Sequence, residues 1–449
     1  MTTGLHRLWK LPLPYAVWLA LPLQLIMIWV GHRGWVQYER NHNYLYVAEQ
    51  ALPFDLEQWR YFTQKELHRS IDLTFAPPVV DDGVEEIRLT IDRRHIGSLN
   101  SNLPESGKSK YYRAEIEFGG QTHRVKTRYV GDNHWHWLYP QKSWKIKTRS
   151  GDPIRDRKVF FIKNTPTPVF EDHVANQIAA EIGLIVPDVR PVKLFVNGAY
   201  SGVFHWQDVA DESVLRRFRR MPGSIYSGDG VADSAYDQDG VSQLFSDQKH
   251  WPKVASRNAD QLEDRSDIEA LIVMINHPDP KTFRAFADDH IDLEQFAKFT
   301  ALDRLLGGEH HDYTHNHKIY FDPYKGRFEP IAWDLAWWLS YGRIAGLDQC
   351  LNPMLIRIRE QPELELLIQR ALLDLCQRYP PDEIDARIDR AAAMGRRALA
   401  ADGFRDVREH TSTSMLRLGQ IHSCHFSMTK FEADVYDLKL GYLKRYKWL

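Results

Sequence analysis

The sequence predicts an α+β fold, with a sheet-rich first half, a ligand-bearing hairpin and a helical second half. Three observations support this fold class. Apolar and polar residues alternate across 87–91 and 112–118, which is the two-residue period of a strand. Two aromatic runs flank the turn Asp322-Pro323-Tyr324-Lys325-Gly326. Apolar residues recur every three or four positions across 353–376, 381–400 and 430–446, which is the helical period.

The remaining elements follow from local signals in chain order. Asn197-Gly198 lies between two apolar runs and predicts a tight hairpin turn. Asp292 is a suitable N-cap for a helix that a Gly-Gly pair ends. Further strands are expected at 125–129, 144–148, 159–162, 192–196, 202–206, 318–321 and 328–333, and further helices at 170–182, 211–220, 265–276 and 292–306.

Length and composition limit the classes of protein that this chain can represent. Its 449 residues are enough for two to three domains, or for one large domain with appendages, and 43% of them are hydrophobic. The net charge of −2 gives no global attraction to nucleic acid, so we expect no nucleic-acid partner. The three cysteines are far apart and form neither a disulfide framework nor a metal-binding spacing.

The N-terminal region predicts a single-pass membrane anchor. Leu11 to Val30 contains no charged residue and is long enough to cross a bilayer as a helix, with Arg7 and Lys10 before it. A cleaved signal peptide and a buried core helix are the alternatives. We expect the protein in the cell inner membrane, with its large domain on the exported, periplasmic or extracellular side. The expected divisions are a tail and anchor (1–35), a stalk (36–80), a core (81–350) and a helical part of the same domain (351–449).

The hairpin predicts a metal site at its open end. If the hairpin is symmetric about Lys325, Asn316 lies across from Asp334, and directly opposed residues are about 5 Å apart. Asp312 lies four residues before Asn316. An Asp, an Asn and a second Asp suit Mg²⁺ or Mn²⁺ and the chemistry of phosphoryl transfer. The alternatives are that Asp334 caps a helix and that Asp312 and Asn316 only form Asx turns.

Two further segments contain candidate ligand-binding residues. Lys142 and Lys145 lie in or beside a strand with one basic and one apolar face, and the pattern does not decide which of them faces phosphate. Trp135 belongs to an aromatic run that could stack a base or a sugar, or could belong to the core. The sequence contains no Gly-rich phosphate loop.

Four histidines near the hairpin leave a different class of enzyme open. His310, His311, His315 and His317 could, with a carboxylate, bind zinc or iron in a metal-dependent hydrolase. The alternative is that they are solvated or support neighbouring groups through hydrogen bonds.

Five segments in one order resemble the CotH-type atypical kinases of spore coats and bacterial envelopes. The resemblance covers about residues 85 to 449. It rests on 140–147, 195–204, 312–320, 331–334, and the helical tail from 352–355 through 431–435.

The resemblance implies a distant protein-kinase-like fold that uses ATP and Mg²⁺ or Mn²⁺. It implies that Asp312 is the base or orienting residue for an acceptor hydroxyl, and that Asn316 and Asp334 hold the metal. Lys142 or Lys145 would neutralise phosphate oxygens, and Asp208 could pair with that lysine. The implied acceptor is a hydroxyl of a protein or an envelope glycan.

Three departures from the family pattern favour an alternative, a pseudokinase that acts as a membrane-tethered binding or scaffold module. Ala336 replaces the second Asp of the family's WD-x-D strand end, and Gln141 replaces the first lysine of its KK pair. A family Arg is replaced near Ala175-Asn176. The sequence gives no oligomeric state.

Overall fold

The computed structural model describes residues 67–449, apart from 72, 80, 104, 132–135, 138, 165–169, 229–243, 257–260, 309–310, 312–315, 336–351 and 409–422. The predicted anchor, Leu11 to Val30, lies outside the described residues, as does most of the predicted stalk. In the part that is described, no helix combines the length and the apolar character that a membrane span needs.

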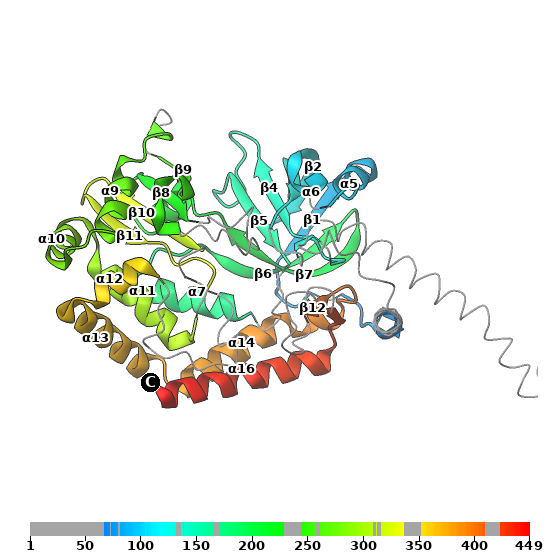
Figure 1. Ribbon diagram of the computed structural model, residues 1–449. Coiled ribbons are helices and arrows are strands. Elements are labelled where there is room, and N and C mark those ends of the chain that lie inside the picture. The colour runs from blue at the N-terminus through cyan, green and yellow to red at the C-terminus, as the bar shows by residue number, and fades with distance from the viewer. Residues whose placement is uncertain are drawn as a thin grey trace, which may run out of the picture.

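The first half of the chain folds into a closed barrel with the strand order β1-β2-β3-β4-β5-β7-β6 (Figure 1). The strands predicted from alternation are confirmed, but their closure into a barrel was not predicted. Strands β6 and β1 close it by parallel pairing, with Glu86 beside Lys193. The bounds are β1 (Glu86–Ile91), β2 (Tyr112–Phe118), β3 (Gln121–Tyr129), β4 (Trp144–Thr148), β5 (Val159–Lys163), β6 (Val189–Val196) and β7 (Ala199–Asp208).

The barrel wall has an apolar inner face and a polar outer face, because side chains alternate along each strand. In β4, Trp144 and Ile146 are buried in the barrel core, whereas Lys145 and Lys147 face outward. The predicted turn between β6 and β7 is confirmed, with Asn197 at φ 51° and Gly198 at φ 82°. Positive φ at both positions is what a type I′ hairpin turn requires.

A second sheet has the strand order β11-β10-β8-β9. It contains the predicted hairpin together with two strands that were not predicted. Its strands are β8 (Ser224–Gly228), β9 (Lys253–Ala255), β10 (His317–Asp322) and β11 (Arg327–Pro330), and a small separate sheet pairs β12 (Asp406–Arg408) with β13 (Ser423–His425).

Helices form most of the rest of the described chain. The helix predicted over 353–376 is two helices, because Pro362 cannot continue a helix and instead begins the second one. The bounds are α5 (Arg93–Leu99), α6 (Glu105–Ser109), α7 (Glu171–Glu181), α8 (Glu212–Arg217), α9 (Ser266–Ile275), α10 (Pro280–His290), α11 (Leu293–Leu306), α12 (Pro353–Arg359), α13 (Pro362–Arg378), α14 (Pro381–Ala400) and α16 (Met428–Trp448), with 3₁₀ turns at Leu244–Ser246 and Gln248–His250.

Three of the longer helices pack against one side of the barrel, whereas the short helices α5 and α6 lie beside β1, β2 and β3 (Figure 1). Figure 1 shows α7, α14 and α16 on the β6–β7 side. A shared core joins them, and it includes Val174 of α7, Val203 of β7, Ile388 of α14 and Val435 of α16. The predicted α+β arrangement, sheet-rich first and helical last, is confirmed.

Candidate functional site

The β10–β11 hairpin forms as predicted but in a different register. Ile319 pairs with Pro330, so the pairing is centred between Tyr324 and Lys325 and not on Lys325. Continued outward, this register places Asn316 level with Trp333, one residue before Asp334. The predicted direct opposition of Asn316 and Asp334 is therefore wrong by one position.

The turn explains the shift in register. Asp322 pairs with Arg327, which leaves a four-residue loop. The Asp322 carboxylate accepts hydrogen bonds from the backbone N–H groups of Tyr324 and Lys325, at 2.9 and 3.3 Å, and Gly326 has φ 66°. Turn residues alone do not reveal whether a loop has an odd or an even number of residues, so sequence could not fix the register.

The two predicted metal ligands flank the open end of the hairpin in the same unusual backbone conformation. Asn316 (φ 66°) directly precedes β10, and Asp334 (φ 54°) follows soon after β11, both half-buried. Asn and Asp tolerate the left-handed region better than most other residues. Such a conformation costs on the order of 1–3 kcal/mol and is concentrated at functional sites. Asp312, the predicted base, lies outside the described residues.

His311 fixes the strand end that carries Asp334. Its Nδ1 lies 2.8 Å from Asp303 Oδ2, and its Nε2 lies 2.6 Å from the Trp333 carbonyl oxygen. Both partners are acceptors, so both ring nitrogens donate and the ring is an imidazolium. Burial disfavours this charge, but Asp303, the Trp333 carbonyl and Asp334 outweigh it and raise the pKa of His311 to about 9.

This geometry argues against His311 as a zinc or iron ligand, because neither ring nitrogen has a lone pair available. His317 is buried, with its Nε2 3.3 Å from Asn352 Nδ2. His310 and His315 lie outside the described residues. Within the described ranges, no group of three His, Cys, Asp or Glu side chains is placed to hold a metal ion.

Three ammonium groups gather around two aromatic rings beside Asp334. We call the rings of Phe161 and Trp333 the aromatic platform; both are buried in one cluster. Lys145 Nζ lies 5.6 Å from the Phe161 ring centroid. Lys163 Nζ lies 5.5 Å from both centroids, and Lys318 Nζ lies 5.2 Å from that of Trp333. Cations at this distance are attracted to the ring faces.

Two of the platform lysines, Lys145 and Lys163, carry charge without a nearby carboxylate in the part of the chain that the structure describes. Lys318 contacts the Ser227 hydroxyl. Among the described residues, no carboxylate lies within ion-pair distance of Lys145 or Lys163. Sequence reasoning found Lys145 but missed Lys163 and Lys318. Alternation places Lys163 at the end of β5 on the face of Phe161, but only tertiary packing brings it to the Trp333 ring.

Lys142, the other candidate, has a different environment. It lies in the loop before β4, where its ammonium donates to the Tyr139 carbonyl at 3.0 Å. Desolvation lowers the pKa of Lys142 to about 8. Trp135 lies outside the described residues, and the neighbouring Trp137 is buried in the barrel core. For Trp137, the core interpretation of the aromatic run is confirmed.

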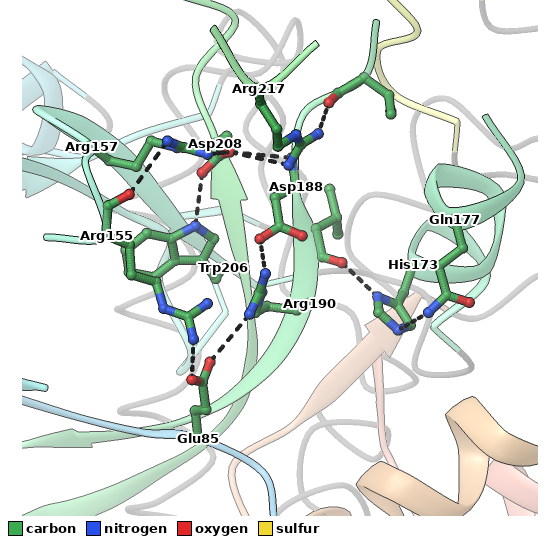
Figure 2. Close-up of polar contacts among 12 residues, drawn as sticks. Glu85, Arg155, Arg157, His173, Gln177, Asp188, Arg190, Trp206, Asp208 and Arg217 are labelled. Atoms are coloured by element: carbon green, nitrogen blue, oxygen red, sulfur yellow. Dashed lines mark hydrogen bonds and ion pairs between the residues drawn. The ribbon is translucent and has the colours of Figure 1, made fainter. Parts of the chain in front are cut away.

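Asp208 does not pair with Lys142 or Lys145. Its carboxylate lies 2.8 Å from Arg157 and 3.7 Å from Arg217, and it accepts a hydrogen bond from Trp206 Nε1 at 3.0 Å (Figure 2). Alternation explains the error, because Asp208 shares the inner face of β7 with Trp206, whereas Lys145 lies on the outer face of the wall.

The ion pairs around Asp208 continue across the end of the barrel. Arg190 contacts Asp188 and lies 3.7 Å from Glu85, which also contacts Arg155 (Figure 2). A cavity of about 540 Å³ lies beside this network, between α7 and the start of β6. It is lined by residues such as His173, Gln177 and Arg217, and the platform residues do not line it.

Gln141, one of the departures from the family pattern, has a structural environment. It is buried, and its Nε2 donates to both Asp402 carboxylate oxygens at 2.8 Å and to the Ser201 carbonyl at 2.9 Å. Gly202, at φ 118°, makes this approach possible, since a Cβ there would lie 2.0 Å from Gln141 Nε2. Gln141 therefore joins the barrel to the C-terminal segment and does not face the platform.

Comparisons with known proteins agree with the sequence resemblance. A family model described as CotH kinase protein matches residues 128–406. No curated protein matches the sequence. Among solved structures, the chain is similar to one in the Shewanella oneidensis MR-1 complex of HipA, HipB and operator DNA, with 13% identity and a TM-score of 0.29.

That similarity covers 64% of this chain and 57% of the other, so this chain spans little more than half the length of the solved one. A likeness this low carries no argument about function. The family match stands on its own, because it includes both hairpins, the platform, Asn316 and Asp334 and covers more than half of the sequence. The protein therefore belongs to the CotH kinase family and is kinase-like.

Proposed function

We propose that this protein is an ATP-dependent kinase that transfers the γ-phosphoryl group to a hydroxyl of a protein or an envelope glycan. The observation that carries the proposal is the grouping of Lys145, Lys163 and Lys318 around the platform. One platform residue, Trp333, directly precedes Asp334 in the sequence. Phosphate oxygens need cations, and Lys145 and Lys163 lack a carboxylate partner within the described residues.

The residues at the hairpin fit a divalent cation by the chemistry of their donors. Asp334 offers a carboxylate and Asn316 an amide oxygen, which are the hard oxygen ligands that Mg²⁺ and Mn²⁺ prefer. Both are held in a left-handed backbone conformation at the open end of one hairpin. When bound, such a cation would neutralise charge on the phosphates of ATP.

The protein's own residues would act mainly by position and charge. Lys163 and Lys145 would hold phosphate oxygens from the barrel side, and Lys318 would do so from the hairpin side. Asp312 would accept or orient the proton of the acceptor hydroxyl. His311 would keep the Trp333 carbonyl, and so the following Asp334, in place. Phosphoryl transfer requires little else from a protein beyond orientation and preorganised charge.

Asp334→Ala tests the proposal. We expect this variant to lose metal-dependent ATP turnover while its far-UV circular dichroism stays that of wild type. An Ala at φ 54° costs on the order of 1–3 kcal/mol, which should lower the thermal midpoint without unfolding the domain. Undiminished turnover would remove Asp334 from the site. Asp156→Ala, at an exposed carboxylate distant in sequence from the hairpin, is the matched control and should turn over ATP normally.

A pseudokinase remains the second candidate because Ala336 stands where the family has its second Asp. Gln141 no longer supports it, since that side chain contacts Asp402 and not the platform. A thermal-shift titration with ATP and Mg²⁺ or Mn²⁺ separates the two functions. Stabilisation with label transfer supports the kinase, and stabilisation without any transfer supports the pseudokinase.

We further propose that Leu11 to Val30 anchors the chain in the inner membrane, with the kinase-like domain on the exported side. An uncharged span of this length after Arg7 and Lys10 supports the proposal. Reporter fusions at the C-terminus test it: alkaline phosphatase activity is the expected result, and fluorescence of a cytoplasm-dependent reporter would overturn it.

A further inference from the structure

The outer face of β2, β3 and β4 carries a dense group of cations. Residues at alternate positions on these strands point away from the barrel core, and most are exposed. We call the following six residues the basic face: Arg113, Arg124, Lys126, Arg128, Lys145 and Lys147.

The strand register places like charges directly across from one another. Lys126 is paired with Arg113 on one side and with Lys147 on the other, and Arg128 is paired with Lys145. Directly opposed side chains on adjacent strands are about 5 Å apart, and like charges there destabilise a sheet. Folding alone therefore disfavours this arrangement.

Counter-ions are scarce on this face. Arg124 lies 3.8 Å from Glu115, the acid opposite it. Among the described residues, no carboxylate lies within ion-pair distance of Arg113, Lys126 or Lys147. Cations that are exposed, mutually repelling and unneutralised suit an anionic partner.

The basic face is continuous with the candidate active site. Lys145 belongs to both, because it is paired with Arg128 in the sheet and its ammonium lies near the Phe161 ring of the platform. An anionic chain that follows β3 over Arg124, Lys126 and Arg128 would therefore end beside Lys145, at the platform. We propose that the basic face binds an acidic segment of a protein acceptor, with carboxylates or phosphoserines at alternate positions, and directs it to the site. This inference rests on the proposed function.

The geometry favours a polypeptide over other anionic partners. Same-face residues along β3, such as Arg124 and Lys126, repeat at about 6.8 Å, which is also the two-residue repeat of an extended peptide. Single-stranded nucleic acid usually stacks its bases on free aromatic faces, but Tyr111 and Tyr112 each have a cation over the ring, Arg128 at 5.1 Å and Lys110 at 5.5 Å.

A membrane surface is a poorer match. Stable attachment to lipid combines basic residues with inserted apolar side chains. In the described part of the chain, no large apolar side chain is exposed on β2, β3 or β4.

The test uses the detergent-solubilised full chain without nucleotide and a fluorescent peptide of alternating Glu and Ser, measured by anisotropy. We expect binding that weakens with salt, because exposed charges are screened. Lys126→Glu should weaken it about tenfold, equivalent to about 1.4 kcal/mol. Lys444→Glu, an equal charge change at an exposed position on α16, should leave it unchanged.

A second readout separates binding from folding. Lys126→Glu replaces two repulsive cross-strand pairs with attractive ones, so its thermal midpoint should rise while peptide affinity falls. Equal affinity in wild type and Lys126→Glu would overturn the inference. Tighter, Lys126-dependent binding to anionic vesicles or to an anionic polysaccharide would also overturn it, in favour of that partner.

The binding assay is independent of catalysis. Asp334→Ala should bind the peptide as wild type does. If the peptide binds but wild type does not turn over ATP, the proposed function fails and the inference about the basic face is retained. If ATP turnover is normal but Lys126→Glu changes neither peptide binding nor peptide phosphorylation, the inference about the face fails alone.

Discussion

Two clusters of charged side chains occupy the two sides of the same barrel wall, and they differ in how their charges are paired. At the barrel end, Asp208 is buried with Arg157 at 2.8 Å, and each arginine of that network has a carboxylate nearby. On the outer side, Lys145 and Lys163 lie beside aromatic rings, with no carboxylate partner among the described residues. Neighbouring strands of one barrel wall, such as β5 and β7, thus carry charges in opposite electrostatic environments.

The comparison separates charges that serve the fold from charges that serve a ligand. A buried ion pair is costly to break, because the remaining charge has lost its water and its partner. A half-exposed lysine beside an aromatic ring adds little to stability. Its removal should instead weaken the binding of an anion. Substitutions on the two sides should therefore change different measurements.

The largest effect on stability is expected for Asp208→Ala. It removes the partner of Arg157, whose side chain is only 11% exposed, and this should lower the free energy of unfolding by about 3–5 kcal/mol in urea denaturation. The matched control is Asp374→Ala, which removes an exposed partner of Arg378 on α13 and should cost less than about 1 kcal/mol. Equal losses in the two variants would contradict the assignment of the barrel-end network to the fold.

The next largest effect on stability is expected for replacement of His311, a paired charge close to the candidate site. This effect should depend on pH. Its pKa is raised to about 9, from an ordinary value of 6.5. A raised pKa means that its stabilisation is fully present below pH 6.5 and is lost as the pH rises through 9. We expect the free energy of unfolding of wild type to exceed that of His311→Gln by roughly 3 kcal/mol at pH 6. At pH 9.5 the two free energies should differ little. A difference that stays constant across this range would contradict the imidazolium.

The smallest effect on stability is expected for Lys163→Ala on the outer side. Loss of its contacts with two rings should cost about 0.5–1 kcal/mol, measured by urea denaturation. The same variant should weaken ATP binding about tenfold or more, which is about 1.4 kcal/mol or more in binding free energy. A variant that loses several kcal/mol of stability and binds ATP normally would place Lys163 with the structural charges.

Local patterns predicted much of this fold, and non-local contacts account for the rest. Alternation identified β1 to β5, and Asn197-Gly198 identified the β6–β7 turn. The parallel pairing of β6 with β1 joins residues that are far apart in sequence, so no local pattern could reveal the closed barrel. Helix α10 was missed although Asp279-Pro280 provides a standard N-cap and first helical residue.

The candidate site was predicted in part, because local patterns reveal some of its residues and non-local contacts bring in the others. Asn316, Asp334 and Lys145 were found because they belong to recognisable hairpin and strand patterns. Lys163 and Lys318 were missed because they meet only at the Trp333 ring, through tertiary packing. The error on Asp208 is different, since strand alternation already places it on the inner face with Trp206. Asp312 and Trp135 lie outside the described residues and stay predictions.

The most direct test of the central claim is ATP binding by the full chain with and without Mg²⁺, measured for wild type, Lys163→Ala and Asp334→Ala. The platform lysines and Asp334 should act as one site for a metal–nucleotide complex. Wild type should bind ATP more tightly when Mg²⁺ is present, Lys163→Ala should bind more weakly but keep the metal dependence, and Asp334→Ala should lose that dependence. Metal-dependent binding of wild-type strength in Asp334→Ala would contradict the account.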